Sequence, residues 1–195
     1  MVPSWYVKPI LTLAGENSDI AGHLMTLFSL AMTHLSVVEL GVRDGNSTVA
    51  LLAGGATRAP MGEASYLTSV DIDPTCPERV RATMARIFGP VPHLETWRRW
   101  QFAARNSVNA AEDWPDAWIN LLFIDTSHEL EQTRHELKAW LPKMTRDCTI
   151  CGHDYCLDGA GVKQAVDEFH ADHPEFRLVV HPWSYGLFIL TRGQS

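Results

Sequence analysis

Residues 35–53 read Leu-Ser-Val-Val-Glu-Leu-Gly-Val-Arg-Asp-Gly-Asn-Ser-Thr-Val-Ala-Leu-Leu-Ala and contain two apolar segments joined by a turn. The first segment is short and ends at Gly41, which predicts a buried strand. The second opens with the polar Asn46 and precedes Gly54-Gly55, which predicts a helix that ends there. Gly41 and Gly45 let the backbone turn tightly and approach a ligand closely. This stretch therefore predicts a strand, a glycine turn and a helix.

Strands and helices alternate along most of the chain. Apolar runs predict strands at 66–71, 93–103, 118–125, 149–153, 176–180 and 186–191, and periodic stretches predict helices at 19–34, 76–88, 127–143 and 162–170. This alternation indicates an α/β fold, a doubly wound Rossmann-like sheet of about seven strands with helices on both faces. Too few residues join the last two strands for a crossover helix, so a mostly parallel sheet with an antiparallel C-terminal strand is expected.

The length of the chain, 195 residues, is typical of one domain. We therefore expect a single domain over 1–195. An irregular arm over 1–16 and the first helix make up residues 1–35, and the core covers 36–192. Hydrophobic residues make up 46% of the chain and charged residues 20%, which are ordinary values for a protein that buries a core.

The charge and cysteine content narrow the function. The chain carries 16 Lys and Arg against 23 Asp and Glu, a net charge of −7, so no nucleic-acid partner is expected. Residues 20–38 lack charged side chains, but His23, Thr26 and Ser29 interrupt them. We therefore expect an amphipathic helix that runs into a strand, and no membrane span. Four cysteines without a secretory signal indicate a reducing cytosol, and hence a cytoplasmic protein.

Polar side chains lie at the expected carboxyl ends of several strands, where sheets of this kind bind ligands. They are Glu39, residues 41–47, Asp71, residues 125–128, and His153-Asp154. The turn is not the Gly-x-Gly-x-x-Gly of dinucleotide sites, because Arg43 occupies the middle position, and it is not a phosphate-binding P-loop. The Asp71 carboxylate is placed to accept hydrogen bonds from two ribose hydroxyls. An ordinary tight turn and a helix-capping aspartate are the alternatives.

Four motifs occur in an order that is typical of a known family. They are Glu-Leu-Gly-Val-Arg-Asp-Gly-Asn-Ser-Thr at 39–48, Ser-Val-Asp-Ile-Asp-Pro at 69–74, Leu-Phe-Ile-Asp-Thr-Ser-His-Glu at 122–129, and Gly-His-Asp-Tyr at 152–155 with Gly-Val-Lys-Gln-Ala-Val-Asp-Glu-Phe at 161–169. With them, the chain resembles the class I S-adenosylmethionine-dependent methyltransferases, in particular the small-molecule O-methyltransferases, from about Val37 to Arg192. It departs from the family pattern at Thr126-Ser127, where Gly-Asp is usual, and at 103–107, which lacks the expected glycine.

The resemblance implies S-adenosylmethionine as cofactor and assigns its parts to different strand ends. Gly41, Gly45 and Ser47 would surround the methionine part, Asp71 would hold the ribose, and Asn106-Ser107 would lie near the adenine. The cofactor-binding residues implied in full are Glu39, Gly41, Val42, Gly45, Asn46, Ser47, Asp71, Ile72, Ser107 and Asp125.

Methyl transfer from a sulfonium needs a deprotonated nucleophile, which a general base or a divalent cation can supply. Asp125 and Asp154 are expected to end adjacent parallel strands, so their carboxylates could share Mg²⁺ or a similar hard cation. In the catechol-type methyltransferases, which the chain resembles here, a base follows the first ligand by three residues. That position is His128, and with Asp125 it forms the expected catalytic pair; His153 is a third candidate metal ligand. Its ordinary pKa near 6.5 would let His128 accept a proton. A helix-capping aspartate and a histidine that only packs are the alternatives.

We therefore expect a cytoplasmic enzyme that transfers a methyl group to a hydroxyl of a small molecule, with sugars and polyphenols as the leading acceptor classes. The alternatives are a catalytically inactive cofactor-binding or assembly protein of the same fold, and a nicotinamide-dependent oxidoreductase. Arg43 in the turn and the closely spaced last strands argue against the oxidoreductase. A homodimer is compatible with the sequence. Cys148 and Cys151 are expected to face opposite sides of one strand, which disfavours a zinc site.

Overall fold

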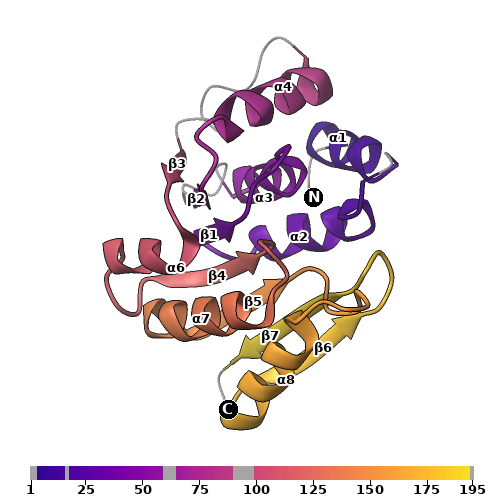
Figure 1. The fold of residues 1–195 in the computed structure, drawn as a ribbon. Helices are drawn as coiled ribbons and strands as arrows, with labels where there is room; N and C mark the ends of the chain where they lie inside the picture. The colour runs from indigo at the N-terminus through magenta and orange to yellow at the C-terminus, as the bar shows by residue number, and fades with distance from the viewer. Residues whose placement is uncertain (1–3, 16–17, 59–64, 90–98, 194–195) are drawn as a thin grey trace.

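The computed structural model describes residues 4–15, 18–58, 65–89 and 99–193 (Figure 1). Over these residues, seven strands form one sheet in the order β3-β2-β1-β4-β5-β7-β6. Their bounds are β1 Ser36–Leu40, β2 Tyr66–Asp71, β3 Trp100–Ala104, β4 Ile119–Ile124, β5 Met144–Gly152, β6 Arg177–His181 and β7 Leu187–Arg192. Neighbouring strands are parallel from β3 to β5, and β7 is antiparallel to β5 and β6. The predicted sheet, mostly parallel with an antiparallel C-terminal strand, is confirmed.

Helices cover both faces of the sheet. Their bounds are α1 Ser4–Ala14, α2 Leu24–Ala31, α3 Asn46–Ala56, α4 Cys76–Phe88, α6 Ser107–Ala110, α7 Leu130–Trp140 and α8 Val162–Asp172, with the 3₁₀ turns η1 Ala21–His23, η3 Ala111–Asp113 and η4 Leu141–Lys143. Helices α1 to α4 lie on one side of the sheet, and α6 to α8 lie on the other (Figure 1). The doubly wound arrangement predicted from the alternation of elements is confirmed.

Alternate residues of the central strands pack into different layers, as the two-residue period of a strand requires. On β1, Val37 belongs to the core cluster under α1 to α4, and Val38 belongs to the cluster under α6 to α8. On β4, Phe123 and Leu122 divide in the same way. Because both faces are buried, these strands read as continuous apolar runs.

The N-terminal segment differs from the prediction. The sequence predicts an irregular arm over 1–16, but Ser4–Ala14 form the helix α1. Ile10 and Leu13, three residues apart, are fully buried in the core cluster shared with α2 and α3. This apolar contact with α2 and α3 stabilises α1, and the local sequence does not predict it. The helix predicted over 19–34 is shorter, because the turn η1 precedes α2.

The prediction that Gly54-Gly55 ends a helix is wrong, because α3 continues to Ala56. A Cβ at Gly54 would lie 2.2 Å from the carbonyl oxygen of Phe28 on α2. The absence of a side chain therefore lets α2 and α3 pack closely. The glycine serves contact between helices and does not stop the helix.

Helix α7 begins at Leu130 and not at the predicted residue 127. His128 has a φ of 60°, in the left-handed region, which a right-handed helix cannot contain. The last turn of the predicted helix, Leu141–Lys143, is 3₁₀.

Two strands also differ in length from their predictions. β5 begins at Met144, before the predicted residue 149. β3 covers Trp100–Ala104, while residues 93–98 of the predicted strand lie outside the described residues.

In the part of the chain that the structure describes, the helices are too short or too polar to cross a membrane.

Candidate active site

The glycine loop between β1 and α3 passes close to the end of β4. Gly41 has a φ of +86°, and a Cβ there would lie 1.9 Å from the carbonyl oxygen of Asp125. Gly45 has a φ of +79°, and a Cβ there would lie 2.5 Å from the side chain of Val80. Only glycine fits both the backbone conformation and the space at these two positions. The tight turn that the sequence predicts is present, and the two glycines let it pack against the end of β4 and against α4.

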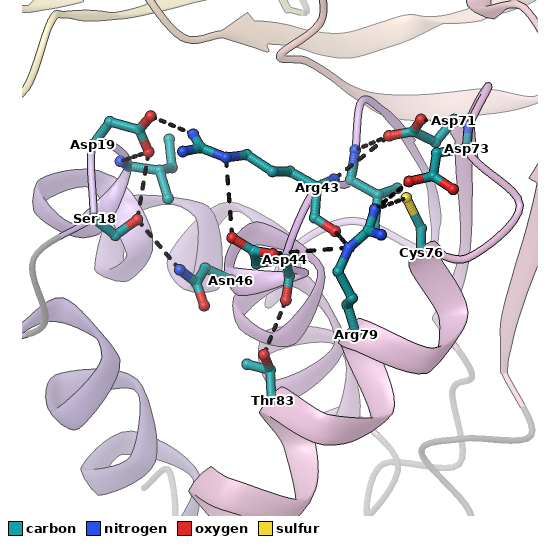
Figure 2. A network of polar contacts seen from close by, with 12 residues as sticks. Ser18, Asp19, Arg43, Asp44, Asn46, Asp71, Asp73, Cys76, Arg79 and Thr83 are labelled. Atoms are coloured by element: carbon teal, nitrogen blue, oxygen red, sulfur yellow. Dashed lines mark hydrogen bonds and ion pairs between the residues drawn. The ribbon is translucent and has the colours of Figure 1, made fainter.

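Asp71, at the end of β2, organises this loop. Its Oδ2 accepts hydrogen bonds from the backbone N–H of Val42 at 2.8 Å and of Arg43 at 3.4 Å (Figure 2). Its Oδ1 accepts one from the backbone N–H of Asp73 at 2.9 Å. A carboxylate oxygen can accept two hydrogen bonds. Oδ1 can therefore still accept one from a ligand, while the residue fixes the loop.

Glu39, on β1, is fully buried beneath the loop. Its carboxylate accepts hydrogen bonds from the hydroxyls of Ser47 at 2.6 Å, Thr48 at 2.8 Å and Ser69 at 2.5 Å. Burial raises the pKa of Glu39 to about 7, against the opposing effect of these hydroxyl donors. The family resemblance implies that Glu39 binds the cofactor, and the residue lies outside the lining of both cavities described below. Its carboxylate instead holds the start of α3 against β1 and β2.

A cavity of about 560 Å³ lies over the ends of β1, β2, β3 and β4. The predicted site residues in its lining are Gly41, Val42, Asp71, Ile72, Asn106, Ser107, Asp125 and His128. A second cavity, of about 480 Å³, has Asn46 and Ser47 in its lining. Four residues line both cavities, which therefore adjoin: Asp19, Val42, Arg43 and Asp125. Gly45, like Glu39, lines neither of these cavities, because it packs against α4.

Two carboxylates and an imidazole converge where the parallel strands β4 and β5 end. Nε2 of His128 lies 2.9 Å from Oδ2 of Asp154 and 3.5 Å from Oδ1 of Asp125. One ligand atom from each of the three residues lies within 4.8 Å of the other two. Carboxylate oxygens and an imidazole nitrogen at this spacing are a donor set that fits a divalent cation. The predicted meeting of Asp125 and Asp154 is present in the structure.

His153, beside Asp154, is almost completely buried. Its Nε2 lies 2.7 Å from the carbonyl oxygen of Ser184, so this nitrogen donates a hydrogen bond. Nδ1 faces the carboxylates, 3.1 Å from Oδ2 of Asp154 and 3.7 Å from Oδ1 of Asp125. A hydrogen bond from the far nitrogen to a backbone carbonyl is how proteins orient a metal-binding histidine. The predicted third ligand is therefore within reach of the same two carboxylates.

The charges of this cluster shift the pKa of its members. The carboxylates of Asp125 and Asp154 raise the pKa of His128 to about 10. Burial would lower the pKa of His153, but the same carboxylates raise it to about 10. Burial would raise the pKa of Asp154, but the two imidazoles hold it well below its usual range. The ordinary value predicted for His128 from the sequence is wrong, because two acidic groups face its ring.

Sequence reasoning missed Glu136, a buried glutamate on α7 behind the larger cavity. Its carboxylate accepts hydrogen bonds from the hydroxyls of Ser107 and Thr126 and from the amide of Gln132. All three donors line the cavity. Thr126 replaces the usual family glycine, and its hydroxyl is used here. The available signal was spacing: Glu136 lies four residues before the buried Trp140, on the same helix face.

Arg43, in the middle of the glycine loop, forms an ion pair with a residue that sequence reasoning also missed. Its Nη1 lies 2.6 Å from Oδ2 of Asp19, in the turn before η1 (Figure 2). Nε of Arg79 on α4 donates a hydrogen bond to the carbonyl oxygen of Arg43 at 2.8 Å. No sequence pattern shows which N-terminal turn faces the glycine loop, so no signal pointed to Asp19.

A comparison with protein families shows which family the chain matches. A family model described as a methyltransferase domain matches residues 38–155, which contain the glycine loop, Asp71, Asp125 and Asp154. No curated protein matches the chain.

Solved structures are similar over nearly the whole chain. A protein from Corynebacterium glutamicum has a TM-score of 0.72 and 17% identity, and the match covers 99% of this chain and 91% of that one. A methyltransferase from Podospora anserina bound to S-adenosylhomocysteine (SAH) has a TM-score of 0.66 and 16% identity, and the match covers 100% of this chain and 89% of that one. An O-methyltransferase from Bacillus cereus in complex with SAH has a TM-score of 0.62 and 15% identity, and the match covers 97% of this chain and 91% of that one. These likenesses show a shared fold, and the family model covers more than half of the chain. The chain therefore belongs to the methyltransferase domain family, as its four motifs predict.

Proposed function

We propose that the chain transfers a methyl group from S-adenosylmethionine to a hydroxyl of a small molecule. One observation carries the proposal. A single cavity is lined by Asp71 at the end of β2, by Ser107 after β3, and by Asp125 and His128 after β4. A cofactor bound at Asp71 and Ser107 would place its other end near Asp125 and His128. Two solved structures of the same fold hold SAH, the product that such a transfer leaves behind.

The proposed cofactor site follows the strand ends across the sheet. Oδ1 of Asp71 accepts one hydrogen bond from the ribose, not the two expected from the sequence, because backbone N–H groups occupy its other positions. Asn106-Ser107 lie at the adenine. Ile72 also lines the cavity, and the residue is 75% exposed. An adenine ring placed over Ile72 would bury this apolar surface, which favours binding. Further contacts are proposed from Gly41, Val42, Asn46, Ser47 and Asp125.

The acceptor hydroxyl is proposed to lie beside Asp125 and Asp154. These carboxylates would hold Mg²⁺ or another divalent cation, and His153, whose Nδ1 faces both of them, would be a third ligand. When bound, the cation would lower the pKa of a hydroxyl placed against it. A cation at the two carboxylates would offset the charge that raises the pKa of His128. Its imidazole would then be neutral and could take the hydroxyl proton.

We propose sugars and polyphenols as the acceptor classes, because both present hydroxyls in pairs that could approach two carboxylate-bearing strand ends together. The test is transfer from methyl-labelled S-adenosylmethionine to a panel of both classes, with Mg²⁺ present or removed by EDTA. The expected result is labelled acceptor together with SAH, dependent on the cation. SAH binding without transfer to any hydroxyl, with or without cation, would favour a catalytically inactive cofactor-binding protein and contradict the proposal.

A further inference from the structure

The second cavity has a balanced set of charges. Its charged lining residues are three aspartates and three arginines, namely Asp19, Asp44, Asp125, Arg43, Arg79 and Arg86. A site that presents both signs of charge is complementary to a ligand that carries both. Figure 2 shows the ion pair of Asp19 and Arg43. Both residues line this cavity and also the larger one.

The main chain of Arg43 is fixed beside the proposed ribose ligand. Its φ is 50°, a left-handed conformation that is unfavourable for a residue with a side chain and persists only where neighbours hold it. Its N–H lies 3.4 Å from Oδ2 of Asp71, and its carbonyl oxygen accepts a hydrogen bond from Arg79 at 2.8 Å. The guanidinium therefore extends from a defined point next to Asp71.

The side chains of the pair are accessible to solvent. The Arg43 side chain is 75% exposed and that of Asp19 is 39% exposed. Exposed ion pairs contribute little to stability, so replacing this one by contacts with a ligand costs little. Burial would raise the pKa of Asp19, but Arg43 lowers it, so the carboxylate is charged at neutral pH.

We propose that Asp19 and Arg43 form a charge clamp for the amino-acid end of the cofactor. In this clamp the α-carboxylate of the ligand pairs with Arg43, and its α-ammonium pairs with Asp19. Two ion pairs replace one, and the cavity keeps its balance of charge. The clamp rests on the proposed function, because it assigns a role to the same cofactor.

A purely structural role for the pair would be to tie the turn before η1 to the glycine loop. Two ligands separate this role from the clamp. SAH carries the amino-acid end, whereas 5′-methylthioadenosine has the same adenosine and thioether without it. Loss of the clamp should affect only SAH, while distortion of the glycine loop should weaken both ligands together.

The experiment is calorimetric titration of both ligands into the full chain and its Arg43→Gln and Asp19→Asn variants. Arg43→Gln should weaken SAH at least about 10-fold, because it removes a charge-assisted hydrogen bond. Asp19→Asn should also weaken SAH, and 5′-methylthioadenosine should keep its affinity within about twofold in both variants. The matched control is Arg134→Gln, which breaks a partly exposed ion pair with Glu168 between α7 and α8 and should change neither affinity.

Each other outcome overturns a defined claim. Equal weakening of both ligands in Arg43→Gln assigns the pair to loop structure and overturns the clamp. Unchanged SAH affinity in both variants also overturns the clamp but leaves the proposed function standing. Failure of the unsubstituted chain to bind SAH overturns the proposed function, and the clamp with it.

Discussion

His128 and Asp154 follow different strands, yet Nε2 of the histidine lies 2.9 Å from Oδ2 of the aspartate. Both residues have left-handed backbones, with φ values of 60° and 61°. A residue with a side chain adopts this conformation at a cost of about 1–2 kcal/mol. Such backbone strain concentrates at functional sites, where the surrounding structure holds it. The contact therefore supports a chemical role for the ends of β4 and β5.

Asp154→Asn should weaken the binding of a divalent cation. The substitution removes one of two carboxylates that face the same space, and hard cations depend on charged oxygen ligands. We expect an affinity loss of at least about 10-fold, of the order seen when metal sites lose a supporting group. Calorimetric titration with Mn²⁺, a hard cation of suitable size, measures it. Asp158→Asn, an exposed aspartate in the following loop, is the matched control. Equal Mn²⁺ affinities in all three proteins would contradict the cation site.

His128→Gln should lower turnover by about 10²–10⁴ because it removes the group proposed to accept the hydroxyl proton. SAH affinity should stay nearly unchanged. Turnover, calorimetric affinity and melting temperature are measured on the same preparation. His135→Gln, exposed on α7, provides a control for the loss of a histidine from the same region. A His128→Gln enzyme that works within a few-fold of the unsubstituted rate would show that the imidazole only packs.

Asp71→Ala should weaken the binding of SAH by about 1.5–3 kcal/mol, which is the usual contribution of a hydrogen bond to a charged group. Asp71 also holds the backbone of Val42 and Asp73, so the melting temperature should fall as well. Calorimetry below the lowered melting temperature separates the two effects. Unchanged affinity in a folded variant would remove Asp71 from the ribose site.

Glu39→Gln should change how stability depends on pH. The folded pKa of Glu39 is raised to about 7 from an ordinary value of 4.5, because the carboxyl is buried. The folded state therefore binds a proton that the unfolded state releases, and this group destabilises the fold increasingly as pH rises from about 4.5 to 7. The variant lacks this titration.

The difference in unfolding free energy between Glu39→Gln and the unsubstituted chain, measured with urea, should shift in favour of the variant by about 1–3 kcal/mol between pH 4.5 and pH 7.5. A difference that does not vary with pH would mean that Glu39 titrates normally in the folded state.

Local patterns predicted the parts of the site that lie at strand ends. The apolar run before Gly41 and the run before Asp125 each predict a buried strand, and parallel pairing brings the ends of such strands to one edge. The positions of Asp71 and Asp154 follow from the same argument. These predictions are possible because the apolar runs of strands and the residues that form turns are local features of the sequence.

Contacts between distant segments could not be predicted in this way. Gly54 looks like a helix end in the sequence, and only the approach of Phe28 shows why α3 continues. Asp19 pairs with Arg43, and two carboxylates raise the pKa of His128. Each of these features depends on which surfaces the fold brings together, and no local pattern contains that information.

Binding of the cofactor across the ends of β1, β2 and β3 is tested directly by an NMR titration of the ¹⁵N-labelled chain with SAH. The mass of the chain, 21.8 kDa, suits this method. We expect saturable shifts concentrated at the backbone amides of Gly41, Asp71 and Ser107, which lie along one cavity. Shifts confined to other surfaces, or a spectrum that SAH leaves unchanged, would contradict this expectation.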